Sequence, residues 1–238
     1  MDAIDAFVLH ARPYRESSQL LEMLSAQEGR IGVLVRGSRG AKRSHPLQPF
    51  RRYRLVLAGR GELRRAQSAE PVDAPRLLAG HPLFAAIYLN ELLVRLTFRD
   101  VPLPDVFALY ETALDALARG EALEATLRRF ERELLDELGY GHRYGETVAG
   151  EPVREDGLYT FDAHAGLREA RPGSSTGPCY AGRSLLALEQ GELQGEDVLR
   201  DAKRLMRAAL APHLGDKPLN SRELFRPVRV LRTDDSGD

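Results

Sequence analysis

The chain has 238 residues, 43% of them hydrophobic, and a formal net charge of -1, a composition typical of a globular protein of one or two domains. No apolar run reaches about 18 residues and the first residues lack the basic and apolar regions of a signal peptide, so we expect no membrane span and a cytoplasmic location. A single cysteine, Cys179, excludes a disulfide framework and a cysteine zinc cluster.

The charge is unevenly distributed along the chain. Eleven Lys and Arg residues fall between Arg30 and Arg65, against one acid, Glu62. Residues 1–70 hold 13 bases and 7 acids, a charge of +6, whereas residues 71–238 hold 21 bases and 28 acids, a charge of -7. Such segregation predicts that the N-terminal part faces a polyanion.

The N-terminal part reads as a small β domain. Alternating apolar and polar residues predict five short strands, at residues 4–10, 19–24, 30–36, 52–57 and 62–68. In the third strand Ile31, Val33 and Val35 share one face, and the arginines at its two ends share the other. Five strands in about 70 residues favour an OB-fold barrel, a common nucleic-acid-binding domain.

The basic residues of this barrel are the candidate nucleic-acid contacts. Some fall on the polar faces of the predicted strands, some in the glycine-rich segment 37–44, and one in the turn at residues 59–61; they are Arg30, Arg36, Arg39, Lys42, Arg43, Arg52, Arg54 and Arg60. Guanidinium and ammonium groups neutralise phosphates irrespective of sequence. Phe50 and Tyr53 are nearby aromatics, which either stack on bases or pack in the core.

From residue 79 the hydrophobic pattern becomes helical. It predicts helices at 83–98, at 104–120 between Pro104 and Gly120, at 122–138, at 183–189, and at 196–211 with Pro212 ending the last one. Residues 145–182 are rich in Gly, Pro and Ser and predict an irregular β insertion, with short strands near Val153 and residues 158–161. The predicted fold is α+β: an OB barrel over residues 1–78, then a helical domain over 79–238.

No catalytic signature accompanies these elements. The chain lacks a phosphate-binding Gly-Lys-Ser/Thr loop, a Gly-x-Ser-x-Gly motif and a His-Glu-x-x-His motif, and its six histidines show no metal-ligand spacing. A nuclease would need acidic metal ligands on the basic face, where Glu62 stands alone. We therefore expect a binding protein with no enzymatic activity, no cofactor and no metal.

One predicted helix suggests a site for a second partner. Arg128, Arg129 and Arg132 lie beside an apolar stripe that includes Phe130 and Leu134. An apolar groove rimmed by arginines suits an acidic, amphipathic peptide. Ordinary packing of the helix with its arginines exposed explains the same pattern.

A series of short segments runs in order through most of the sequence, at residues 6–10, 12–13, 16–18, 29–30, 35–37, 47–50, 59–62, 88–93, 127–131, 138–141 and 215–226, the last reading GDKPLNSRELFR. In these segments the chain resembles the RecO family of bacterial DNA-repair and recombination mediators. Each segment is short, and the match rests on all of them occurring in the right order.

The resemblance implies an OB-fold joined to a helical domain, binding to single- and double-stranded DNA, and annealing of complementary strands. It also implies contact with the acidic C-terminal tail of the single-strand-binding protein and with RecR, help in loading the RecA recombinase, and a nucleoid-associated location. Arg128 and the stripe beside it match the tail-binding position of similar proteins. Some members carry a four-cysteine zinc site in the insertion, which Cys179 alone cannot form. An RNA-binding barrel of the translation machinery remains the alternative.

Overall fold

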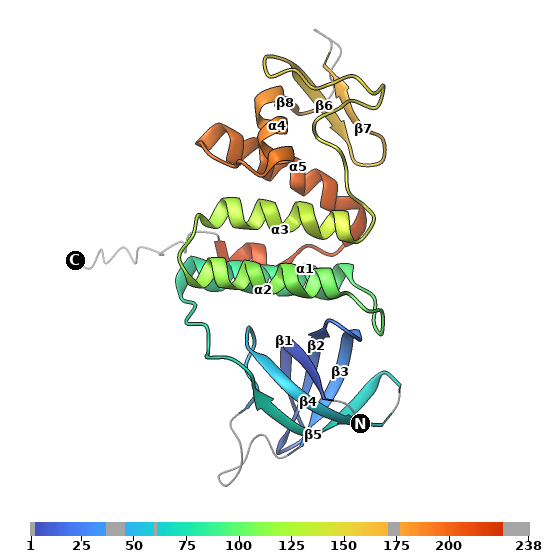
Figure 1. Cartoon of the computed structure of the whole chain (residues 1–238), viewed down its shortest axis with the longest axis vertical. Coiled ribbons are helices and arrows are strands. Elements are labelled where there is room, and N and C mark those ends of the chain that lie inside the picture. Colours follow the sequence, from blue (N-terminus) through green and yellow to red (C-terminus); the bar gives the residue numbers. More distant parts are fainter. Residues whose placement is uncertain (1–2, 37–45, 60, 171–176, 226–238) are drawn as a thin grey trace, which may run out of the picture.

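The computed structural model describes residues 3–36, 46–59, 61–170 and 177–225. The molecule is elongated: a β-barrel occupies one end, layers of helices lie in the middle, and a small sheet caps the other end (Figure 1). The predicted arginine-rich loop, with Arg39, Lys42 and Arg43, and the turn residue Arg60 lie outside the described residues.

The predicted five-stranded barrel is confirmed. Its strands pair in the closed order β1-β2-β3-β5-β4, with β3 and β5 parallel and the other pairs antiparallel, which makes the barrel OB-like. The strands are β1 (Ile4–Tyr14), β2 (Ser18–Ser25), β3 (Gly29–Val35), β4 (Arg52–Ala58) and β5 (Leu63–Pro71).

Strand parity inside the barrel follows the sequence pattern. Ile31 and Val33 on β3 are buried in the barrel core, together with Tyr53 and Leu55 on β4. Tyr53 therefore takes the core-packing role of the two that its sequence position allowed, and its hydroxyl accepts a hydrogen bond from the Gln48 amide at 3.0 Å.

A β-bulge in β1 couples the barrel to the helices. The register against β2 shifts between Val8 and His10, so Leu9 is the extra residue and its carbonyl is left without a ladder partner. The buried Asn90 donates a hydrogen bond to that carbonyl at 2.7 Å and accepts one from the Tyr110 hydroxyl. Asn90, a polar residue in an apolar helix, thus supplies a hydrogen bond to the Leu9 carbonyl, which the bulge would otherwise leave unpaired.

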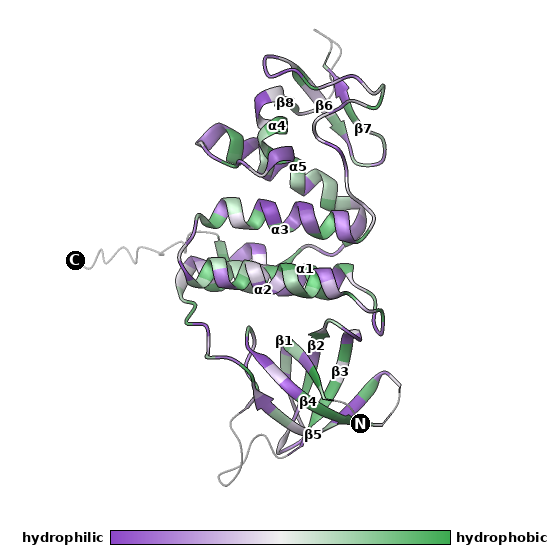
Figure 2. Ribbon diagram, viewed as in Figure 1, coloured by the Kyte–Doolittle hydropathy of each residue, from purple (hydrophilic) through white to green (hydrophobic). Residues whose placement is uncertain are grey.

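Three helices form the middle of the molecule: α1 (Gly80–Leu96), α2 (Pro104–Ala118) and α3 (Leu123–Glu137). The sequence of α1 is mostly apolar, whereas the ribbon of α3 in Figure 2 alternates between hydrophilic and hydrophobic residues. The predicted first helix, 83–98, was placed a little too late in the chain, because α1 already begins at Gly80 and ends at Leu96, with Phe98 exposed beyond it. Among the described residues, no helix is long and apolar enough to cross a bilayer.

The distal end contains a three-stranded sheet in the order β7-β6-β8. Its strands and the elements that follow are β6 (Leu158–Asp162), β7 (Gly166–Glu169), β8 (Cys179–Ala181), α4 (Gly182–Gln190), α5 (Glu196–Leu214) and the 3-10 helix η1 (Asn220–Phe225). The predicted stop at Pro212 was wrong, since α5 continues through it to Leu214. A proline this near the end of a helix removes one amide donor and leaves the preceding turns intact.

Candidate nucleic-acid interface

Four strands of the barrel present one continuous outer face. The ladders place Arg12 opposite Leu20, Leu20 opposite Leu34, and Leu34 opposite Arg65. Residues paired across a ladder point to the same side of the sheet. These four side chains therefore form one row across β1, β2, β3 and β5, with a guanidinium group at each end and two partly buried leucines between them.

The arginines of this face carry charge that the fold leaves available. Arg12 and Arg65 are exposed, as is Arg36, which follows the last residue of β3. Within the part of the chain that the structure describes, these three arginines have no ion-pair partner. Exposed guanidinium groups without a carboxylate partner are what phosphate neutralisation requires.

A groove of about 940 Å³ runs between this outer face and the helices. Its barrel wall includes Arg12, Leu20 and Leu63, and its helical wall includes Ile87 and Val94. The face of the middle strands is where OB barrels hold extended ligands. Here that face opens toward α1 and η1 and offers an apolar floor with guanidinium groups at its rim.

Arg30 also lines this groove, and its guanidinium group already has partners within the protein. It forms an ion pair with Glu22 and donates hydrogen bonds to the Thr97 carbonyl at 2.9 and 3.2 Å. Glu22 also accepts from Arg99 at 2.5 Å. Arg30 lies on the outer face, as its strand parity predicts, but its 15%-exposed side chain ties the barrel to the end of α1.

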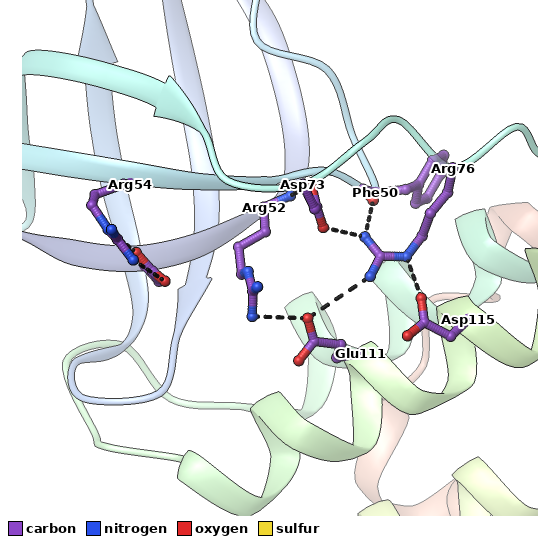
Figure 3. Close-up of polar contacts among 8 residues, drawn as sticks. Phe50, Arg52, Arg54, Asp73, Arg76, Glu111 and Asp115 are labelled. Atoms are coloured by element: carbon purple, nitrogen blue, oxygen red, sulfur yellow. Dashed lines mark hydrogen bonds and ion pairs between the residues drawn. The ribbon is translucent and has the colours of Figure 1, made fainter.

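Arg52 belongs to a second network, which joins the barrel to α2 (Figure 3). It pairs with Glu111 at 2.9 Å. Beside it, Arg76 pairs with Asp73 and with Asp115, both at 2.7 Å. Burial by itself lowers the pKa of Arg76, but the hydrogen bonds to Asp115 and Asp73 outweigh burial and raise it. This network fixes the orientation of the barrel on α2.

Arg54 is exposed on β4 and also has a carboxylate partner. Its guanidinium group donates to Asp5 at 2.9 and 3.2 Å, and this hydrogen bonding raises its pKa. Of the eight predicted contacts, three are thus ion-paired, Arg36 is exposed and unpaired within the described chain, and four lie outside the described residues. Their assignment to DNA binding stays a prediction.

Sequence reasoning missed two arginines of the outer face. Arg12 lies beyond the predicted end of the first strand, and the bulge at Leu9 changes which residues face outward after it. Arg65 was counted in the basic segment, but its position opposite Leu34 depends on the parallel pairing of β3 with β5. Plain alternation would have placed Arg12 on the same face as the buried Ala6 and Val8, because no local signal predicts the bulge that reverses it. No local signal predicts the pairing of Arg65 either.

The predicted partner groove on α3 is closed in this structure. Phe130 and Leu134 are 1% and 0% exposed, so the expectation that they line an open groove was wrong. The reason is the layering seen in Figure 1, where α3 lies between α1 and α2 on one side and α5 on the other. Of the three arginines beside the stripe, Arg129 is exposed, Arg132 is partly buried and Arg128 is buried.

Arg128 is part of a buried ionic network. It pairs with Glu131 at 2.6 Å, and the hydroxyl of Tyr88 on α1 donates to the same carboxylate oxygen at 2.6 Å. Burial raises the pKa of Glu131, and the charge of Arg128 and the hydrogen bond from Tyr88 oppose that rise. One Glu131 oxygen and the Arg128 Nε have no hydrogen-bond partner among the described residues. The hydrogen bond from Tyr88 to Glu131 therefore fastens α3 to α1.

The closed five-stranded barrel, its cationic outer face and the helical domain behind it define an OB-like barrel protein of the kind that binds nucleic acids. The described residues contain no group of three His, Cys, Asp or Glu side chains that could hold a metal ion.

Two family models match the chain: Recombination protein O N terminal over residues 1–75, and Recombination protein O C terminal over residues 79–223. The chain belongs to the RecO family of DNA repair proteins, which are non-enzymatic recombination mediators. It is 42% identical over 222 residues to a DNA repair protein RecO of Pseudomonas paraeruginosa, covering 92% of each chain. It is 43% identical over 224 residues to one of Pseudomonas putida, covering 93% of this chain and 96% of the relative.

Proposed function

We propose that this RecO-family protein binds single- and double-stranded DNA on the outer barrel face and anneals complementary strands. The observation that carries the proposal is the exposure of Arg12, Arg36 and Arg65, each without an ion-pair partner among the described residues. Bringing two strands onto one cationic face lowers the repulsion between their phosphates. Arg39, Lys42 and Arg43 follow closely in the sequence, and we propose that their charges add to the DNA contacts.

The dependence of binding on salt tests this proposal. Replacing Arg12, Arg36 and Arg65 together by Gln should weaken binding to DNA of any sequence. The slope of log K against log salt should flatten by about 2 for single strands and about 3 for duplex, since each lost phosphate contact removes about 0.7 or 0.9. An unchanged slope would mean that the outer face does not contact DNA.

A matched control removes the same charge elsewhere. Arg119, Arg154 and Arg200 are exposed, ion-paired arginines outside the barrel, with side-chain exposures of 61%, 62% and 63%. Their triple Gln variant should keep the wild-type slope. A separate triple variant of Arg39, Lys42 and Arg43 measures the contribution of the adjacent segment by the same assay.

We further propose that the helical domain docks the acidic C-terminal tail of the single-strand-binding protein near α3. Family membership supports the partner, and the exposed Arg129 supports the place. Arg128 would reach a tail carboxylate only by exchanging its partner Glu131. Arg129→Ala and Arg128→Ala should each weaken binding of a labelled tail peptide and leave binding to naked DNA intact. Equal loss of both would instead indicate a shared surface or a folding defect.

The mediator role itself needs strands coated with the single-strand-binding protein. We propose that the protein anneals such strands through the tail and, with RecR, helps load RecA onto them. Annealing of complementary oligonucleotides should therefore fail when the coating protein lacks its last acidic residues. Annealing of naked strands only would leave a general DNA binder, and no annealing at all would favour the RNA-binding alternative.

A further inference from the structure

The barrel exposes one aromatic ring on its cationic face. Residues 1–78 contain four Phe and Tyr residues, all of them described. Phe7 and Tyr53 are buried, and Phe50 packs partly against the helical core. Tyr14, the last residue of β1, is 38% exposed. A large aromatic side chain exposed on a small barrel is a candidate contact for a ligand.

The position of Tyr14 places it beside the unpaired arginines. It follows Arg12 by two residues on β1, so both side chains project from the outer face. Its ladder partner on β2 is Ser18, too small to cover the ring. The next β2 residue, Gln19, pairs with Val35, which places Arg36 next to Ser18 at this end of the sheet. Tyr14, Arg12 and Arg36 therefore share one end of the outer face.

The turn after Tyr14 holds a further cation over the ring. Arg15 has φ of 53°, in the left-handed region that residues with a Cβ seldom adopt. In this conformation its guanidinium carbon lies 5.3 Å from the centroid of the Tyr14 ring. Unusual backbone geometry of this kind often marks a binding site. The hairpin thus presents an aromatic ring surrounded by positive charge at the edge of the groove.

We propose that Tyr14 is a stacking platform for an unpaired DNA base, with Arg12 and Arg36 contacting the flanking phosphates. The inference rests on the proposed DNA-binding function and adds to it a structural reason for recognising single strands. Every base has a π face, so stacking on a protein ring is tolerant of sequence. Bases within a duplex already stack on their neighbours, so their faces are not available to the Tyr14 ring.

The test compares Tyr14→Ala with Tyr14→Phe on three probes: a short oligothymidylate, the same backbone without bases, and a duplex. Losing one stacked base should weaken oligothymidylate binding roughly 5- to 150-fold for Tyr14→Ala. Tyr14→Phe keeps the ring and should bind like the wild type. Binding of duplex and of the abasic strand should change less than about twofold, and the salt slope should stay constant because no phosphate contact is lost.

Tyr140 supplies a matched control, since it is also 38% exposed but lies after α3, stacked on His213 at 4.0 Å. Tyr140→Ala should bind all three probes like the wild type. Wild-type affinity of Tyr14→Ala for oligothymidylate would overturn the inference, as would an equal loss on the abasic strand. Failure of the DNA-binding proposal would look different, because the wild type itself would then bind none of the probes in a salt-dependent manner.

Discussion

The Arg76 network offers a quantitative test of how the barrel is held on the helices. Arg76→Met keeps an apolar side chain and removes a guanidinium group that is 10% exposed and pairs with Asp73 and Asp115. Asp73 is 19% exposed, so losing the hydrogen-bonded ion pair between Arg76 and Asp73 should cost about 1.5 to 3 kcal/mol, as for other hydrogen bonds between charged groups. Asp115 is 42% exposed, and solvent screening limits the contribution of the Arg76–Asp115 ion pair to about 0.5 kcal/mol. The expected total is about 2 to 3.5 kcal/mol.

For a chain of this length, about 2 to 4 °C of melting temperature corresponds to each kcal/mol, so Arg76→Met should melt roughly 4 to 14 °C lower in a thermal scan. Arg119→Met is the control, because Arg119 pairs with Glu121 at the surface and should contribute about 0.5 kcal/mol or less. A double variant with Asp73→Asn should be less destabilised than the sum of the two single variants. If Arg76→Met melted with the control, the network would not be what joins barrel and helices.

Three further changes test other parts of the structure. Asn90→Ala leaves the Leu9 carbonyl and the Tyr110 hydroxyl without their partner, and should lower the free energy of unfolding in urea by about 2 to 4 kcal/mol; a loss near zero would mean water replaces the amide. Glu91→Ala removes the acceptor for two amides and a hydroxyl of η1, so hydrogen exchange in η1 should speed up while the barrel keeps its rate. Burial, together with two neighbouring histidines, lowers the pKa of His213 from its usual 6.5. The unfolded chain therefore binds this proton more readily than the folded protein, and stability falls as pH drops below 6.5. His213→Gln should lose less melting temperature on acidification than the wild type, and an equal loss would refute this account of His213.

The sequence predicted the architecture because hydrophobic period is a local signal. Alternation located all five strands, and the switch to helical spacing after the barrel located the helices. The same signal failed where backbone geometry changed without a change in composition. No sequence signal near Leu9 predicts the bulge. Pro212 did not end the helix, because a proline so close to a helix end removes few backbone hydrogen bonds and destabilises the helix little.

The candidate site was harder to predict because ion pairing is a long-range property. Glu111 is distant from Arg52 in sequence, yet the two side chains pair at 2.9 Å. Burial posed the same problem on α3, whose apolar stripe looks the same whether it meets another helix or a partner peptide. The structure resolves this for Phe130 and Leu134, since α5 covers the side of α3 that faces away from α1 and α2.

Charge counting along the chain overstates the cationic surface for a physical reason. Of the eleven basic residues between 30 and 65, seven are described, and four of these pair with acids that lie outside that segment: Arg30 with Glu22, Arg52 with Glu111, Arg54 with Asp5, and Arg64 with Glu28 and Asp100. For these arginines a DNA phosphate must replace a carboxylate already in place, so binding exchanges one ion pair for another and gains little. Arg36 and Arg65 need no exchange, and neither does Arg12, which the count omitted. Among the described residues of the barrel, the proposed affinity for DNA should therefore depend on these three arginines more than on the four that are already ion-paired.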